Sequence, residues 1–121
     1  MIAVVRRYFR VVNRLSHDMN AVGLAAMFTA TCPCRAQVRA VRSAAGKAEH
    51  FVGTAHVNVV RPSVEGPTRA SVLVNFDVSR SGVVTAGGAM VTSVPARPGL
   101  QRIFRLENDG GRWLVYRIDA A

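Results

Sequence analysis

The chain has 121 residues, the usual size of one domain, so we expect a single domain over residues 1–121. Half of its residues are apolar, but no apolar run approaches the roughly 18 residues of a membrane-spanning helix. The net charge is +9, yet the basic residues are scattered in runs of at most two and are not interleaved with aromatic residues. We therefore expect no transmembrane segment and no nucleic-acid partner.

The apolar start of the chain, residues 1–5, is followed at once by Arg6 and Arg7. A signal peptide has the opposite order, with the charge before the apolar segment. We therefore expect no targeting segment. The composition leaves the compartment open between the cytoplasm and the soluble part of an exported or membrane-attached protein.

The first half of the chain is helix-like. Apolar residues recur every three or four positions from Ile2 to Leu15, which predicts an amphipathic helix. A short helix is expected through Leu24, Met27 and Phe28. A third helix is expected to have Cys32 as its N-cap and Pro33 as its first residue, because proline suits that position, and to end at Gly46.

After His50 the apolar residues alternate with a period of two, which is typical of strands. We expect hairpins at 79–82 and, strongly, at the Asn-Asp-Gly-Gly turn of 108–111, and a bend or bulge at Gly87-Gly88. The fold class is therefore α+β, with three N-terminal helices packed in the concave face of a bent, mostly antiparallel sheet of about five strands. The expected strands are Phe51–Val60, Ala70–Val78, Val83–Val94, Leu100–Glu107 and Arg112–Ile118.

Two motifs carry a resemblance to a known family. They are Tyr8-Phe-Arg-Val-Val-Asn13 in the first helix and the closing hairpin Phe104-Arg-Leu-Glu-Asn-Asp-Gly-Gly-Arg-Trp-Leu-Val-Tyr-Arg-Ile118. With this order of elements, the chain resembles the nuclear transport factor 2-like superfamily, also called the cystatin-like cone. Its cysteine segment resembles actinobacterial lipoprotein-type domains of unknown function. The superfamily resemblance implies a cone-shaped fold, but this fold hosts enzymes and non-catalytic modules alike.

In the catalytic members of that superfamily, the resemblance implies an Asp or His base and a Tyr or Asp in the mouth of the cone. The candidates here are Tyr8, His56 and Asp77. Asp77 and His56 alternate away from apolar neighbours, so a solvated strand face is the expected place for both. Tyr8 shares its helix face with core residues, where packing is the more frequent role.

The two cysteines, Cys32 and Cys34, are separated by a single proline. Paired cysteines of zinc motifs are usually two to four residues apart, so we predict no metal site, and no cofactor motif is present. A disulfide and two free thiols remain open alternatives.

The main functional hypothesis is a non-enzymatic binding or accessory domain for a small apolar or anionic ligand. A homodimer through the outer sheet face is expected, because apolar residues lie on both sides of the strands at Val52, Val60, Leu73, Leu114 and Ile118. One alternative is an isomerase- or dehydratase-type enzyme that uses Tyr8, His56 and Asp77. Another is an anion-binding module on a helix face that carries Arg35, Arg39 and Arg42.

Overall fold

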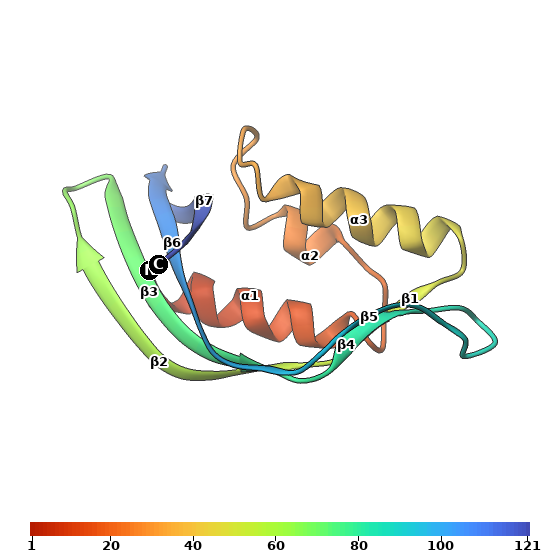
Figure 1. Cartoon of the computed structure of the whole chain (residues 1–121). Coiled ribbons are helices and arrows are strands. Elements are labelled where there is room, and N and C mark those ends of the chain that lie inside the picture. The colour runs from red at the N-terminus through yellow and green to blue at the C-terminus, as the bar shows by residue number, and fades with distance from the viewer.

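The computed structural model describes residues 1–121 and contains three helices followed by seven strands. The helices are α1 (Ile2–Arg14), α2 (Val22–Ala25) and α3 (Arg35–Gly46). A long sheet curves around α1, and α2 and α3 lie on the side of α1 away from it (Figure 1). None of the helices combines the length and the apolarity needed to cross a membrane. The strands are β1 (His50–Val52), β2 (Ala55–Val64), β3 (Arg69–Val78), β4 (Ser81–Val84), β5 (Met90–Val94), β6 (Arg97–Asp109) and β7 (Arg112–Ala120).

The core lies between α1 and the concave face of the sheet. Val5 and Phe9 are one turn apart on α1 and are both buried, whereas the arginines of this helix are exposed. The ring of Phe9 lies 5.0 Å from that of Phe76 on β3 and 5.8 Å from that of Phe104 on β6. The amphipathic pattern of the first helix is therefore confirmed, and its apolar face packs against the concave face of the sheet.

The strands form two antiparallel sheets, β2-β3-β6-β7 and β1-β4-β5, so the expected single sheet of about five strands was wrong. The expected strand 51–60 is interrupted at Gly53, where φ is +105°, and its two parts belong to different sheets. The expected strand 83–94 is a hairpin closed by the turn at Thr85–Ala89. A period-two pattern does not reveal where a strand is interrupted or turns back, because the same alternation continues on both sides of a glycine.

The hairpin expected at 79–82 is not formed, because β3 and β4 do not pair with each other. Strand β3 pairs with β2 and β6, whereas β4 pairs with β1 and β5, so the chain crosses between sheets at Ser79 and Arg80. Gly82 permits the close pairing that follows, since a Cβ atom there would lie 2.0 Å from the carbonyl oxygen of Thr92. Residues of both sheets line a cavity beside α1.

The closing hairpin is confirmed. Gly110 and Gly111 both have positive φ, 61° and 88°, and the N–H of Gly111 donates to Oδ1 of Asn108 at 2.8 Å. Glycine adopts this backbone without the steric penalty of a side chain, and asparagine reinforces the turn by its own hydrogen bond. The turn places β7 antiparallel to β6.

Helix α3 begins two residues later than expected, at Arg35, with Cys34 as its N-cap. The segment before it forms tight turns in which Arg35 N–H donates to Cys32 and Ala36 N–H to Pro33, both at 3.1 Å. These bonds span three residues, as in a 3₁₀ turn, so Pro33 lies in the approach to the helix. The prediction of Pro33 as the first helical residue was wrong for this reason.

Candidate functional site

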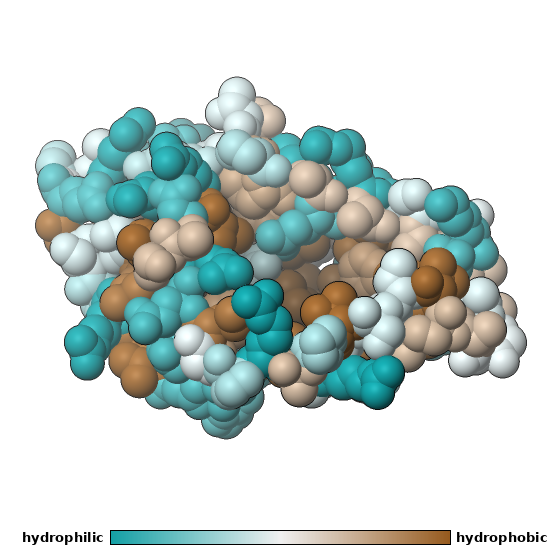
Figure 2. Space-filling model, in the orientation of Figure 1, coloured by the Kyte–Doolittle hydropathy of each residue, from teal (hydrophilic) through white to brown (hydrophobic).

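A cavity of about 460 Å³ lies between α1, α3 and strands of both sheets. Figure 2 shows a hollow near the middle of this face of the molecule, with hydrophobic residues around it. Of its 20 lining residues 13 are hydrophobic, and this size and character are typical of a pocket for a small molecule. Its aromatic lining comes from α1 and from three strands: Tyr8, Phe9, Phe51, Phe76 and Phe104.

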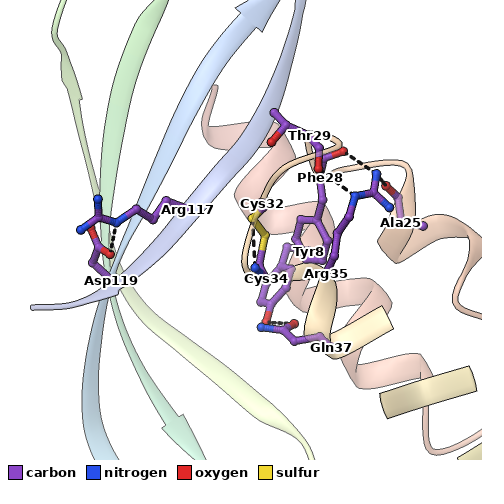
Figure 3. Close-up of a disulfide and its surroundings, with 10 residues drawn as sticks. All are labelled: Tyr8, Ala25, Phe28, Thr29, Cys32, Cys34, Arg35, Gln37, Arg117 and Asp119. Carbon is purple, nitrogen blue, oxygen red and sulfur yellow. Dashed lines mark hydrogen bonds and ion pairs between the residues drawn. A yellow bond between two sulfur atoms is a disulfide. The ribbon is translucent and has the colours of Figure 1, made fainter. Parts of the chain in front are cut away.

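A hydrogen bond joins the two helices beside the cavity. The hydroxyl of Tyr8 donates to Oε1 of Gln37 at 2.8 Å (Figure 3). Burial raises the pKa of Tyr8, and its bond to Gln37 offsets only part of this effect. The Tyr8 ring meets that of Phe104 edge to face, with centroids 5.0 Å apart, so the phenol is fixed by both packing and hydrogen bonding.

Arg102 is the only charged residue that lines the cavity. It lies opposite Val74 in the β3–β6 register, and Val74 is completely buried under the helices, so Arg102 belongs to the concave side of the sheet. Its Nη1 donates to the carbonyl oxygen of Gln101 at 2.7 Å, and it takes part in none of the ion pairs of the structure. A cation without a carboxylate partner thus lies at an apolar cavity.

Two of the three catalytic candidates lie elsewhere. His56 and Asp77 are register partners on β2 and β3, and neither lines the cavity. The Asp77 carboxylate accepts hydrogen bonds from the N–H of Gly99 at 2.8 Å and from Asn58 at 3.1 Å. These bonds, that from Gly99 above all, lower the pKa of Asp77. Of the candidates, only Tyr8 reaches the cavity.

The three arginines of α3 have different environments. The guanidinium of Arg35 turns back toward the end of α2, whereas Arg39 and Arg42 are exposed (Figure 3 shows Arg35). Arg35 therefore bonds carbonyl groups at the end of α2 and in the segment that follows it. Anion binding by the exposed pair stays a prediction. The acceptors of Arg35 are the carbonyl oxygens of Thr29 at 2.8 Å, Phe28 at 3.1 Å and Ala25 at 3.4 Å.

In the structure a disulfide joins Cys32 and Cys34, whose Cα atoms are 5.1 Å apart (Figure 3). Both cysteines are buried, and the N–H of Cys34 lies 3.3 Å from Sγ of Cys32. No group of three or more His, Cys, Asp or Glu side chains gathers in a way that would hold a metal ion. The segment therefore has the geometry of a local cross-link before α3.

Sequence reasoning missed Gln37 and Arg102. Arg102 did carry a signal, because it stands between Leu100 and Phe104 in the period-two series, at a position where an apolar residue is expected. Gln37 carried none, since a polar residue on a surface helix is ordinary. Its importance comes from its contact with Tyr8, 29 residues earlier in the chain.

Solved structures share this architecture across nearly the whole chain. The intermembrane space region of the chloroplast protein ARC6 superposes with a TM-score of 0.71 at 13% identity, over 98% of this chain and 93% of that one. An NTF2-like protein of unknown function from Pseudomonas putida gives 0.58 at 12% identity, over 97% and 80%. This chain has the nuclear transport factor 2-like fold.

An uncharacterised protein with a cystatin-like fold from Caulobacter vibrioides agrees with this conclusion, at a TM-score of 0.61 and 13% identity over 99% of this chain and 86% of that one. No protein-family model and no curated protein matches the sequence. At these identities the similarity shows the nuclear transport factor 2-like fold alone. The expected superfamily resemblance is confirmed at that level, and the actinobacterial resemblance stays a prediction.

Proposed function

We propose that this chain is a non-enzymatic binding domain that holds a small, largely apolar molecule in its cavity. The observation that carries the proposal is a space of about 460 Å³ whose lining is mostly hydrophobic and includes five aromatic side chains. Moving an apolar molecule from water into such a space is favourable in proportion to the area covered. Aromatic rings add a rigid surface for it to contact.

The arrangement of polar groups favours binding over catalysis. An isomerase or dehydratase needs a base within hydrogen-bonding reach of its substrate, and no carboxylate or imidazole lines the cavity. Tyr8 does reach it, but burial raises the pKa of Tyr8, so the phenol stays protonated and is a poor base. The enzyme alternative therefore lacks the proton acceptor that its chemistry needs.

Binding is tested by fluorescence titration with Nile red, an uncharged apolar dye. We expect saturable binding to the wild-type chain and a loss of about tenfold or more in affinity for Val83→Phe, which fills part of the cavity. The control is Val64→Phe, because Val64 is 66% exposed and lies outside the cavity. Absent or non-saturable binding, or an equal effect of both variants, would contradict the proposal.

Self-association through the outer face of the β2-β3-β6-β7 sheet is the second part of the proposal. Fewer residues support it than the sequence suggested. Val52 and Ile118 line the cavity, Val60 packs on the core and Leu114 lines a depression beside α1, which leaves Leu73. Leu73 lies in a shallow outer depression of about 170 Å³ with Val59 and Arg61. Arginines at this face repel their copies in a symmetric dimer, so salt should favour association.

Sedimentation velocity at low and high salt tests this association. We expect a dimer that strengthens with salt and is lost in Leu73→Arg, while Val64→Arg, at an exposed site near the end of β2, keeps it. A monomer at every salt concentration and at high protein concentration would overturn this part of the proposal, and the binding function would be unaffected.

A further inference from the structure

Arg102 is out of place in a row of apolar side chains. It stands on β6 two residues before Phe104, which is 1% exposed, and opposite Val74, which is 0% exposed. Two strand residues span about 7 Å, so the Cα atom of Arg102 lies close to the aromatic part of the cavity. An apolar residue here would extend the core, whereas an arginine brings a charge to the edge of an apolar space.

No carboxylate forms an ion pair with this arginine in the structure. The carboxylate of Asp119, on the adjacent strand β7, lies opposite the neighbouring Ile103. That carboxylate is already bound by Arg105 and Arg117, each at 2.6 Å. A guanidinium has five N–H donors, and Arg102 uses one bond to the carbonyl oxygen of Gln101. Most of its donors are therefore free for a ligand.

The side-chain amide of Gln37 also favours a ligand that accepts hydrogen bonds. The Gln37 carbonyl oxygen is taken by Tyr8, while its amide N–H groups have no partner in the structure. No acidic side chain lines the cavity, so the charge there is positive only. A charged acceptor is attracted more strongly beside apolar walls than in water, because screening is weaker there.

We propose that the cavity takes an amphipathic monocarboxylate, with its carboxylate on Arg102 and its apolar body against the aromatic lining. The inference rests on the proposed binding function and names its ligand class. A guanidinium binds a carboxylate through two parallel N–H···O bonds, and one carboxylate balances its single charge. A linear chain and an aromatic ring are both apolar bodies that fit this description, and the experiment separates them.

Calorimetric titration of the full chain with decanoate and with decanol tests the inference, because the two differ only in the head group. We expect decanoate to bind about tenfold more tightly, in keeping with a charged hydrogen bond. Naphthoate and naphthalene form a second pair. A carboxylate preference in either pair supports the inference, and the pair with the tighter carboxylate identifies a chain or a ring as the body.

Variants assign the effect to one residue. Arg102→Gln should weaken decanoate about tenfold and decanol much less, whereas Arg102→Lys should retain part of the preference. Arg39→Gln removes the same charge from an exposed site on α3 outside the cavity and should change neither affinity. Circular dichroism checks that each variant is folded.

The outcomes separate this inference from the function on which it rests. The inference is overturned if Nile red binds saturably but neither ligand pair shows a carboxylate preference. It is also overturned if the preference survives Arg102→Gln or is lost equally in Arg39→Gln. Each of these outcomes leaves apolar binding in place. Failure of Nile red, decanol and decanoate alike to bind overturns both.

Discussion

The hydroxyl of Tyr8 and the side-chain carbonyl of Gln37 are 2.8 Å apart and connect α1 to α3 beside the cavity. The bond has two effects. It satisfies a phenol that packs among aromatic rings, and it orients the Gln37 amide so that its N–H groups remain available. One contact thus supports both the fold and the polarity of the cavity.

Tyr8→Phe should lower the free energy of unfolding by about 1 kcal/mol, because it leaves the Gln37 carbonyl oxygen without its donor. Urea unfolding followed by circular dichroism measures the change. Tyr116→Phe is the matched control: the Tyr116 ring lies against the Arg69 guanidinium, and its hydroxyl makes no hydrogen bond in the structure. Equal losses in the two variants would contradict a specific role for the Tyr8 bond.

Tyr8 should also ionise at a higher pH than an ordinary tyrosine. Its pKa is raised above 10.0 because burial disfavours the phenolate. A raised folded-state pKa gives stability that is complete below the unfolded value and is lost as pH rises through the folded value. The tyrosinate absorbance of wild type minus that of Tyr8→Phe should therefore titrate above pH 10, with unfolding setting in over the same range. A difference spectrum that titrates at or below pH 10 would rule this out.

Asp119 should stabilise the sheet in a pH-dependent manner. The bonds from Arg105 and Arg117 lower its pKa below 3.8. A depressed folded-state pKa gives stability that is present above the unfolded value and is lost as pH falls through the folded value. Asp119→Asn should accordingly be less stable than wild type at neutral pH, and the gap should close in acid below pH 3.8.

Urea unfolding over a pH series measures that gap. Asp109→Asn is the control, since Asp109 is exposed in the closing hairpin and forms no ion pair in the structure. A gap for Asp119→Asn that does not change with pH would contradict the ionic origin of the effect.

Gly82→Ala should destabilise the protein by about 1–3 kcal/mol, because its Cβ would overlap the carbonyl of Thr92 and force β4 and β5 apart. Gly87→Ala is the comparison, since its Cβ would meet only Thr85 Oγ1 at 3.9 Å. Thermal unfolding measures both, and hydrogen exchange should show faster exchange confined to the smaller sheet. A harmless Gly82→Ala would mean that β5 is not held as closely as described.

The Cys32–Cys34 disulfide should protect both thiols. Native protein prepared without reductant is expected to react with no equivalent of a thiol reagent, and reduced, unfolded protein with two. Reduction should change the free energy of unfolding by less than the ~2–4 kcal/mol typical of disulfides, because the loop it closes is very short. Two reactive thiols in native, unreduced protein would show that the cysteines are free.

Local patterns predicted the elements that local physics determines. The burial of Val5 and Phe9 follows from helical spacing, and the turn at Asn108–Gly111 follows from residues that tolerate positive φ. Local patterns did not predict the division into two sheets, because it depends on which strands pair with one another, and some of those strands are far apart in the chain. Gly53 marks the division, yet a glycine in a strand is equally compatible with a bulge.

The cavity was still less predictable. Its walls come from α1, α3 and strands of both sheets, so it depends on contacts between residues far apart in the chain. Arg102 could be found as an interruption in an apolar series, but its significance depends on its forming no ion pair, which only the folded arrangement reveals. His56 and Asp77 are register partners on β2 and β3 and do not line the cavity, and a catalytic role for them stays a prediction.

The backbone of residues 27–29 has a consequence for how copies of this protein can meet. Val115 N–H donates to Met27 and Thr29 N–H to Val115, at 2.8 and 2.9 Å, so this segment occupies the outer edge of β7. At the opposite edge, the side chain of Asn13 bonds both backbone groups of Ala55, and β2 contains a proline at position 62. Part of each border of the larger sheet is thus blocked, which limits strand-to-strand pairing between copies there. The smaller sheet has no such cover on β5, where Met90, Val91 and Val94 are exposed.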